Sequence, residues 1–86
     1  MITMHPGEYL VIAYVDPLNL TRDALAKKLR VSRSAVSRLI AGKATLSAAM
    51  ALKLEQAFDR SAESWMEMQT QHSLRLARQA PNKGRG

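Results

Sequence analysis

The chain has 86 residues, no cysteine, and 13 lysines and arginines against 7 aspartates and glutamates, which gives a formal net charge of +6. This length allows one domain with a small core, and the lack of cysteine excludes disulfide bonds and thiolate metal sites, so oligomerisation remains as a source of added stability. The basic excess indicates a polyanionic partner, and the lack of cysteine fits a cytoplasmic protein. The longest apolar run near the start, residues 9–15, is too short to cross a bilayer, so we expect no membrane association.

The first predicted helix covers about residues 6–15. Pro6 suits the first helical position, and Glu8 in the first turn interacts favourably with the positive end of the helix dipole. We expect this helix to end near Asp16 and Pro17. Its surface is apolar on nearly every side, and three residues outside its main apolar face belong either to the core or to a surface for a partner: Val11, Ile12 and Val15.

Two shorter helices are predicted at about residues 22–29 and 33–41, and together they are typical of a helix-turn-helix motif. Thr21 and Ser32 are each placed to cap the start of a helix, and Gly42 ends the second one. Ala26 lies at the crossing point of the pair, where only a small side chain permits close approach. Any helical bundle contains two amphipathic helices, so the assignment depends on what the outer faces carry.

The outer face of this pair combines short hydroxyl side chains with long cations, which are the residue types that contact base edges and phosphates in a major groove. Between residues 21 and 43 the chain has seven cations and one anion. A helix pair with a merely solvated basic face is the alternative, but the coincidence of polar and basic residues favours double-stranded DNA. We expect Arg33 to read base edges, Arg38 to reach a base or a phosphate, and Lys43 to contact a phosphate. The candidate DNA-binding residues are Thr21, Arg22, Ser32, Arg33, Ser34, Ser37, Arg38 and Lys43.

Two further helices are predicted at about residues 48–59 and 62–79, capped by Ser47 and Ser61. The last helix is long and carries more apolar surface than a domain with four other helices requires. That surface is either core or the seam of a homodimer, since Trp and Met are enriched at interfaces. The first helix is the other candidate for the seam. The candidate dimer residues in the last helix are Trp65, Met66, Met68, Leu74 and Leu76.

The sequence shows no catalytic constellation, no glycine-rich phosphate loop and no pair of acids in an apolar setting, so we expect neither an enzyme nor a cofactor. His5 and His72 are the only histidines, and no spacing links them. We therefore interpret His5 as a helix-entry residue and expect no metal site. One domain is predicted over residues 1–80. Residues 81–86 are predicted to be a disordered basic tail, which is either a stray terminus or a nonspecific DNA arm.

Four segments follow one another in a recognisable order. They are His5-Pro6-Gly7-Glu8, the stretch LAKKLRVSRSAVSRLIAGKATLS from Leu25 to Ser47, the run Met50-Ala51-Leu52-Lys53-Leu54 with Ala57-Phe58, and Trp65 with Gln69 and Leu74. Taken together, residues 5–78 resemble the XRE-type helix-turn-helix proteins and, more narrowly, the HigA family of antitoxins. The resemblance implies an all-α, five-helix, lambda-repressor-like DNA-binding domain.

The same resemblance implies two tasks: binding and neutralising a HigB-like ribonuclease toxin, and repressing the protein's own operon as a homodimer. Two positions depart from the family pattern. Arg30 stands where a glycine is frequent, so the turn either avoids positive φ or accepts strain, and His72-Ser73 replaces a usual Tyr-Asp pair. Two alternatives remain open: a stand-alone XRE-type transcriptional regulator without a toxin partner, and a protein-interaction module whose basic face only keeps it in solution.

Overall fold

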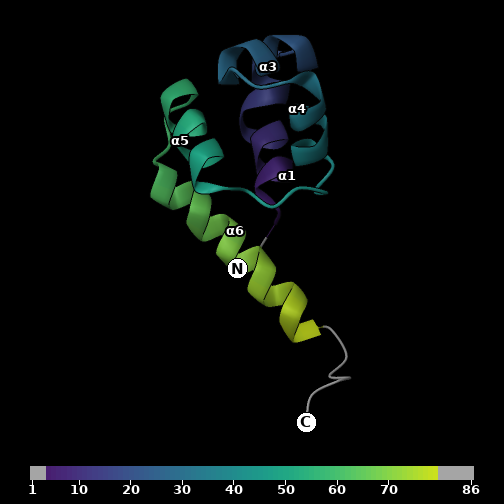
Figure 1. Ribbon diagram of the computed structural model, residues 1–86, viewed down its shortest axis with the longest axis vertical. Coiled ribbons are helices and arrows are strands. Elements are labelled where there is room, and N and C mark those ends of the chain that lie inside the picture. The colour runs from purple at the N-terminus through teal and green to yellow at the C-terminus, as the bar shows by residue number, and fades with distance from the viewer. Residues whose placement is uncertain (1–3, 80–86) are drawn as a thin grey trace.

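The computed structural model describes residues 4–79 of the chain, and every regular element in that part is helical. In chain order the elements are α1 (Pro6–Leu10), η1 (Val11–Val15), α2 (Asp16–Leu18), α3 (Arg22–Leu29), α4 (Arg33–Ile40), α5 (Ala48–Ala57) and α6 (Ala62–Gln79). The first three form one continuous helix, because the residues between them stay in the right-handed helical region. Five helical units therefore result, and the predicted all-α, five-helix fold is confirmed (Figure 1). The predicted tail, residues 81–86, lies outside the described residues.

The first helix continues further than the sequence predicts. It passes through Pro17 and ends at Leu18, where Asn19 adopts a left-handed conformation with φ 56° and caps the helix. The helix tolerates proline because a π-helical turn precedes it, in which the Asp16 N–H donates to the Val11 carbonyl. The wider turn relieves the contact that a proline ring normally makes with the preceding carbonyls.

The start of the first helix is fixed by an unusual cap. His5 Nδ1 accepts a hydrogen bond of 2.9 Å from the Gly7 N–H, while Glu8 Oε1 accepts one of 3.3 Å from the His5 N–H. The same imidazole donates from Nε2 to the carbonyl of Ala44, 2.9 Å away, in the loop after α4. His5 is 5% exposed. It is therefore a helix-entry residue that also ties the start of the chain to a loop 39 residues later.

Gly7 brings the first helix into contact with the backbone of α4. A Cβ atom at this position would collide with the carbonyl oxygen of Leu39, and it would also lie close to the His5 ring. Only a residue without a side chain permits this approach. The end of α4 therefore rests directly on the first turn of the chain.

The core lies among all five helical units. Phe58 enters it by leaving the helix, with φ −132° and ψ 162°, so α5 ends at Ala57 rather than near residue 59 as predicted. Its ring stacks on that of Tyr14 at a centroid distance of 4.5 Å, and this packing replaces the last helical turn. The buried apolar residues are Leu10, Leu25, Ala26, Leu29, Val36, Leu39, Leu46, Ala51, Leu54, Phe58 and Trp65.

Helix α6 has two different halves. Its first half packs on the core through Trp65 and Gln69, whereas its second half projects beyond the other helices (Figure 1). From Ser73 to Gln79 every residue is exposed. None of the helices in residues 4–79 combines the length and apolar character needed to cross a membrane.

Candidate nucleic-acid interface

Helices α3 and α4 are each capped by the hydroxyl group that the sequence suggests. Thr21 Oγ1 accepts a 3.0 Å hydrogen bond from the Ala24 N–H, and Ser32 Oγ accepts one of 3.0 Å from the Ala35 N–H. Such caps typically contribute about 1 kcal/mol each to stability. Thr21 and Ser32 lie at exposed helix starts.

The turn between these helices accepts the strain that a glycine would avoid. Arg30 adopts φ 60° and ψ 44°, a left-handed conformation that costs a residue with a Cβ about 1–2 kcal/mol. The backbone compensates in part, because the N–H of Val31 donates to the Ala26 carbonyl at 3.0 Å. Lys53 Nζ also reaches the Arg30 carbonyl at 3.4 Å. This turn sets the angle at which α4 leaves α3.

Helix α4 has a buried side and an exposed row. Val36 and Leu39 are buried against the core. Ser34 and Arg38 are exposed on the opposite side, followed by Ala41 just after the helix. These three positions follow the four- and three-residue spacing of one helix face. The row is exposed to solvent and is the part of α4 that is able to enter a groove of DNA.

Two arginines lie along the edge where α3 and α4 meet, Arg22 at the start of α3 and Arg33 at the start of α4. Arg22 donates to the hydroxyl oxygen of the half-buried Ser37 at 3.1 Å, and Arg33 Nε lies 3.5 Å from Asp23 Oδ1. The side chains of the ion pair are 67% and 69% exposed, so its contribution to stability is small. The pair directs Arg33 along the edge between the helices. Arg38, which we expect to contact a base or a phosphate, lies on the exposed row and not on this edge.

The loop after α4 is held at two points. The His5 imidazole binds the Ala44 carbonyl, and Gln69 Oε1 of α6 accepts a 2.9 Å hydrogen bond from the Leu46 N–H. Gln69 is itself buried and donates to Ser73 Oγ at 3.0 Å. Lys43 is exposed at the start of this loop. Local sequence patterns do not reveal His5 and Gln69 as loop anchors, because their partners are 39 and 23 residues away.

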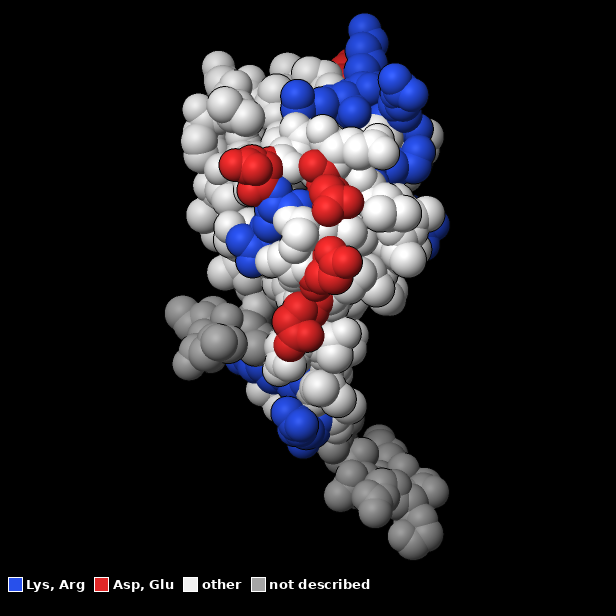
Figure 2. Space-filling model, turned by 90° about the vertical axis from the view of Figure 1, so that its left-hand side faces the viewer, with Lys and Arg blue, Asp and Glu red and all other residues white. Residues whose placement is uncertain are grey.

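One end of the molecule is rich in basic residues. Figure 2 shows most of the lysines and arginines of this face gathered at the end where α3 lies, and an acidic stripe further down over α5 and α6, with a few further basic groups beside and below the stripe. The exposed acids of this part of the chain are Glu55, Asp59, Glu63 and Glu67. Within residues 4–79 there is no group of three or more metal-ligating side chains. The basic end therefore coincides with the helix-turn-helix, and the acidic stripe is directed away from it.

The candidate dimer residues do not form one surface. Trp65 is fully buried in the core of the single chain, so the prediction that it contributes to a dimer seam is wrong for this residue. Its indole packs against Tyr9 and Tyr14, at centroid distances of 5.6 and 6.1 Å. Met66 and Met68 are half-buried against the same core. Leu74 and Leu76 are 39% and 52% exposed on the projecting half of α6.

The sequence and the fold are both similar to those of known helix-turn-helix proteins. Residues 11–65 match the Helix-turn-helix family model. The chain is 39% identical over 79 residues to the virulence-associated protein I of Dichelobacter nodosus, covering 92% of this chain and 73% of that protein. The structure is similar to that of the Pseudomonas aeruginosa protein PA4674 in complex with its operator DNA, with a TM-score of 0.87 and 36% identity over 96% of this chain and 89% of that one. It is also similar to the Pseudomonas aeruginosa antitoxin HigA with the higBA promoter, with a TM-score of 0.83 and 36% identity over 88% and 83% of the two chains.

Proposed function

We propose that this chain, which belongs to the helix-turn-helix family, is the antitoxin of a type II toxin–antitoxin module in the cytoplasm. In this proposal it represses its own operon as a homodimer and neutralises a HigB-like ribonuclease toxin. The observation that carries the DNA-binding part is the exposed row of α4, which stands clear of the core at the basic end of the molecule. The likeness to an operator complex and to a HigA antitoxin supports both parts.

In the proposed complex α4 lies in the major groove. Ser34 and Arg38 face the base edges, where an arginine guanidinium is suited to the two acceptors of guanine. Phosphate contacts come from the two sides: Arg22 at the start of α3, and Lys43 in the anchored loop. The edge between α3 and α4 carries the remaining candidates, which orient the contacting side chains or bind the DNA backbone themselves: Thr21, Ser32, Arg33 and Ser37. The separation of roles follows from position, since phosphate contacts give affinity and base contacts give specificity.

Replacing Arg38 by alanine should weaken operator binding by about 1–3 kcal/mol and relax specificity at one base pair. By contrast, Lys43→Ala should weaken binding to operator and random DNA alike and reduce the steepness of the salt dependence. Gel-shift or fluorescence titration at several salt concentrations measures both effects. Unchanged affinity of the Arg38 variant for operator and random DNA would show that α4 does not enter the major groove.

The toxin part of the proposal has its own test. The product of a small, basic, ribonuclease-like reading frame beside this gene should co-purify with the chain and lose its ribonuclease activity in the complex. The first helix offers a surface for it, because Ile12 and Leu18 are 60% and 57% exposed. A gene without such a neighbour, together with intact binding to its own promoter, would favour the stand-alone XRE-type regulator instead. A chain that binds no DNA at all would be a protein-interaction module.

A further inference from the structure

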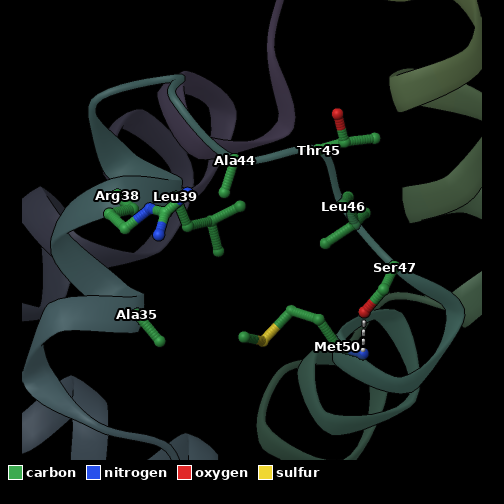
Figure 3. Close-up of a pocket in the computed structure, with 8 residues that line it drawn as sticks. All are labelled: Ala35, Arg38, Leu39, Ala44, Thr45, Leu46, Ser47 and Met50. Atoms are coloured by element: carbon green, nitrogen blue, oxygen red, sulfur yellow. Dashed lines mark hydrogen bonds between the residues drawn. The ribbon is translucent and has the colours of Figure 1, made fainter.

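A small apolar pocket lies between α4 and α5, beside the loop that connects them. Its volume is about 240 Å³. Buried Leu39 and Leu46 form its floor, and the half-buried Ala35 and Met50 form opposite walls. In Figure 3 the side chains of Ala35, Leu39, Leu46 and Met50 all point toward the same space from two helices and a loop. A methionine suits such a wall, because its unbranched thioether adapts to the shape of a bound group.

The pocket opens next to the exposed row of α4. Arg38 belongs to both, since it is exposed on the row and also lines the pocket. Ala35 follows Ser34 directly and therefore lies one helical step from the same row. If α4 lies in the major groove as proposed above, the mouth of the pocket is adjacent to the base edge that Arg38 reaches. In that arrangement the edge of a base is the group nearest to the pocket.

The chemistry of the lining selects the occupant. Five of the eight lining side chains offer only apolar surface, and the other three are Arg38, Thr45 and Ser47. The Ser47 hydroxyl oxygen accepts a 3.1 Å hydrogen bond from the Met50 N–H. In the major groove the apolar group that a base presents is the 5-methyl group of thymine. A methyl group is similar in size to a water molecule, which takes about 30 Å³ of liquid volume, so it enters this pocket together with part of the pyrimidine edge.

We propose that this pocket binds the 5-methyl group of an operator pyrimidine, a thymine next to the base pair contacted by Arg38. The proposal rests on the placement of α4 in the major groove. It adds a way for the protein to recognise a base through apolar contact, without hydrogen bonds. It also extends to 5-methylcytosine, which carries the same group at the same position of the ring. Operator binding by this chain is then sensitive to a single methyl group in each half-site.

The test uses the wild-type protein and the natural operator, with each thymine replaced in turn by deoxyuridine. This change removes the methyl group and leaves every hydrogen-bonding group of the base pair in place. At one position in each half-site we expect affinity to fall about fourfold, and about fifteenfold when both half-sites are changed, which corresponds to about 0.8 kcal/mol for each buried methyl group. At that position 5-methylcytosine should bind more tightly than cytosine by a similar factor.

Two protein variants assign the effect to the pocket. Ala35→Leu fills the space with a good helix former, so it should bind the thymine and deoxyuridine operators with equal affinity. Leu52→Ala, an exposed change elsewhere on α5, should retain the full methyl preference. A methyl preference that persists in the Ala35 variant would overturn the assignment to this pocket.

The outcomes separate this inference from the proposed function. Tight operator binding with no effect of deoxyuridine at any position would overturn the methyl pocket and leave the DNA-binding proposal standing. A wild-type protein that binds neither its promoter nor random DNA would overturn the DNA-binding proposal, and the methyl pocket would fall with it.

Discussion

Replacing Gly7 by alanine is expected to lower the free energy of unfolding by about 3 kcal/mol or more. The added Cβ collides with the Leu39 carbonyl oxygen, a backbone atom that cannot rotate away as a side chain does. The first helix must then separate from the end of α4. A small domain is stable by only about 5–15 kcal/mol, so a large part of its stability is lost, and the melting temperature should fall by more than about 10 °C. Thermal and urea denaturation followed by circular dichroism measure the effect.

Gly42→Ala is the matched control for this change. Gly42 adopts φ +75°, but its nearest neighbours are ring atoms of His5 at 3.8 and 3.9 Å, so a Cβ has room there. Alanine at this position should therefore lower the free energy of unfolding only by the cost of the left-handed backbone, about 1–2 kcal/mol. Equal losses in the two variants would show that close packing at Gly7 has no special role, and a neutral Gly7 variant would contradict the contact between the first helix and α4.

A double change of Leu74 and Leu76 to aspartate is expected to give a folded monomer that loses at least about 100-fold in operator affinity. Both side chains are exposed in the single chain, so polar replacements leave its core intact. One reading helix covers only a half-site, whereas a two-fold dimer places two in successive major grooves about 34 Å apart. Linking the two binding events adds a factor of this order. Sedimentation and gel-shift assays report the two properties separately.

Leu52→Asp controls for the loss of an exposed leucine. Leu52 and Leu76 are both 52% exposed, but Leu52 lies on α5, away from the projecting half of α6. The control should sediment as the wild type and bind operator normally. A wild-type protein that is monomeric at tens of micromolar and occupies an operator one copy at a time would refute the dimer. If the doubly substituted protein is still a dimer, the first helix and not α6 forms the dimer interface.

The helical periods and caps predict most of this fold, because they are local properties of the chain. Ser32 followed by an apolar pattern is sufficient to place α4. The misplaced helix ends have tertiary causes. Phe58 leaves the helix to stack on Tyr14, and Pro17 stays inside one because a π-turn precedes it. Neither effect is visible in the neighbouring residues alone.

In the candidate site, too, some features are local in sequence and others depend on tertiary contacts. Its polar and basic residues are readable from the pattern on α4. The orientation of Arg33 is not, since it depends on Asp23 across the turn. Sequence reasoning also leaves Trp65 between core and interface, because an apolar stripe has the same spacing in both cases. In the structure the Trp65 ring packs against Tyr9 and Tyr14, so this residue belongs to the core.

The double anchoring of the loop after α4 has a consequence for how the protein folds. The contacts of His5 and Gln69 close two long chain segments onto the same few residues, one from each side in sequence. A fragment limited to α3, the turn and α4 lacks both contacts. Both hydrogen bonds that hold the loop with Lys43 come from residues distant in sequence, so we expect this loop to take its final shape late in folding, after the beginning of the chain and α6 have docked. We therefore expect partly unfolded forms that release either end to lose the loop shape that places Lys43, the residue proposed to contact a phosphate.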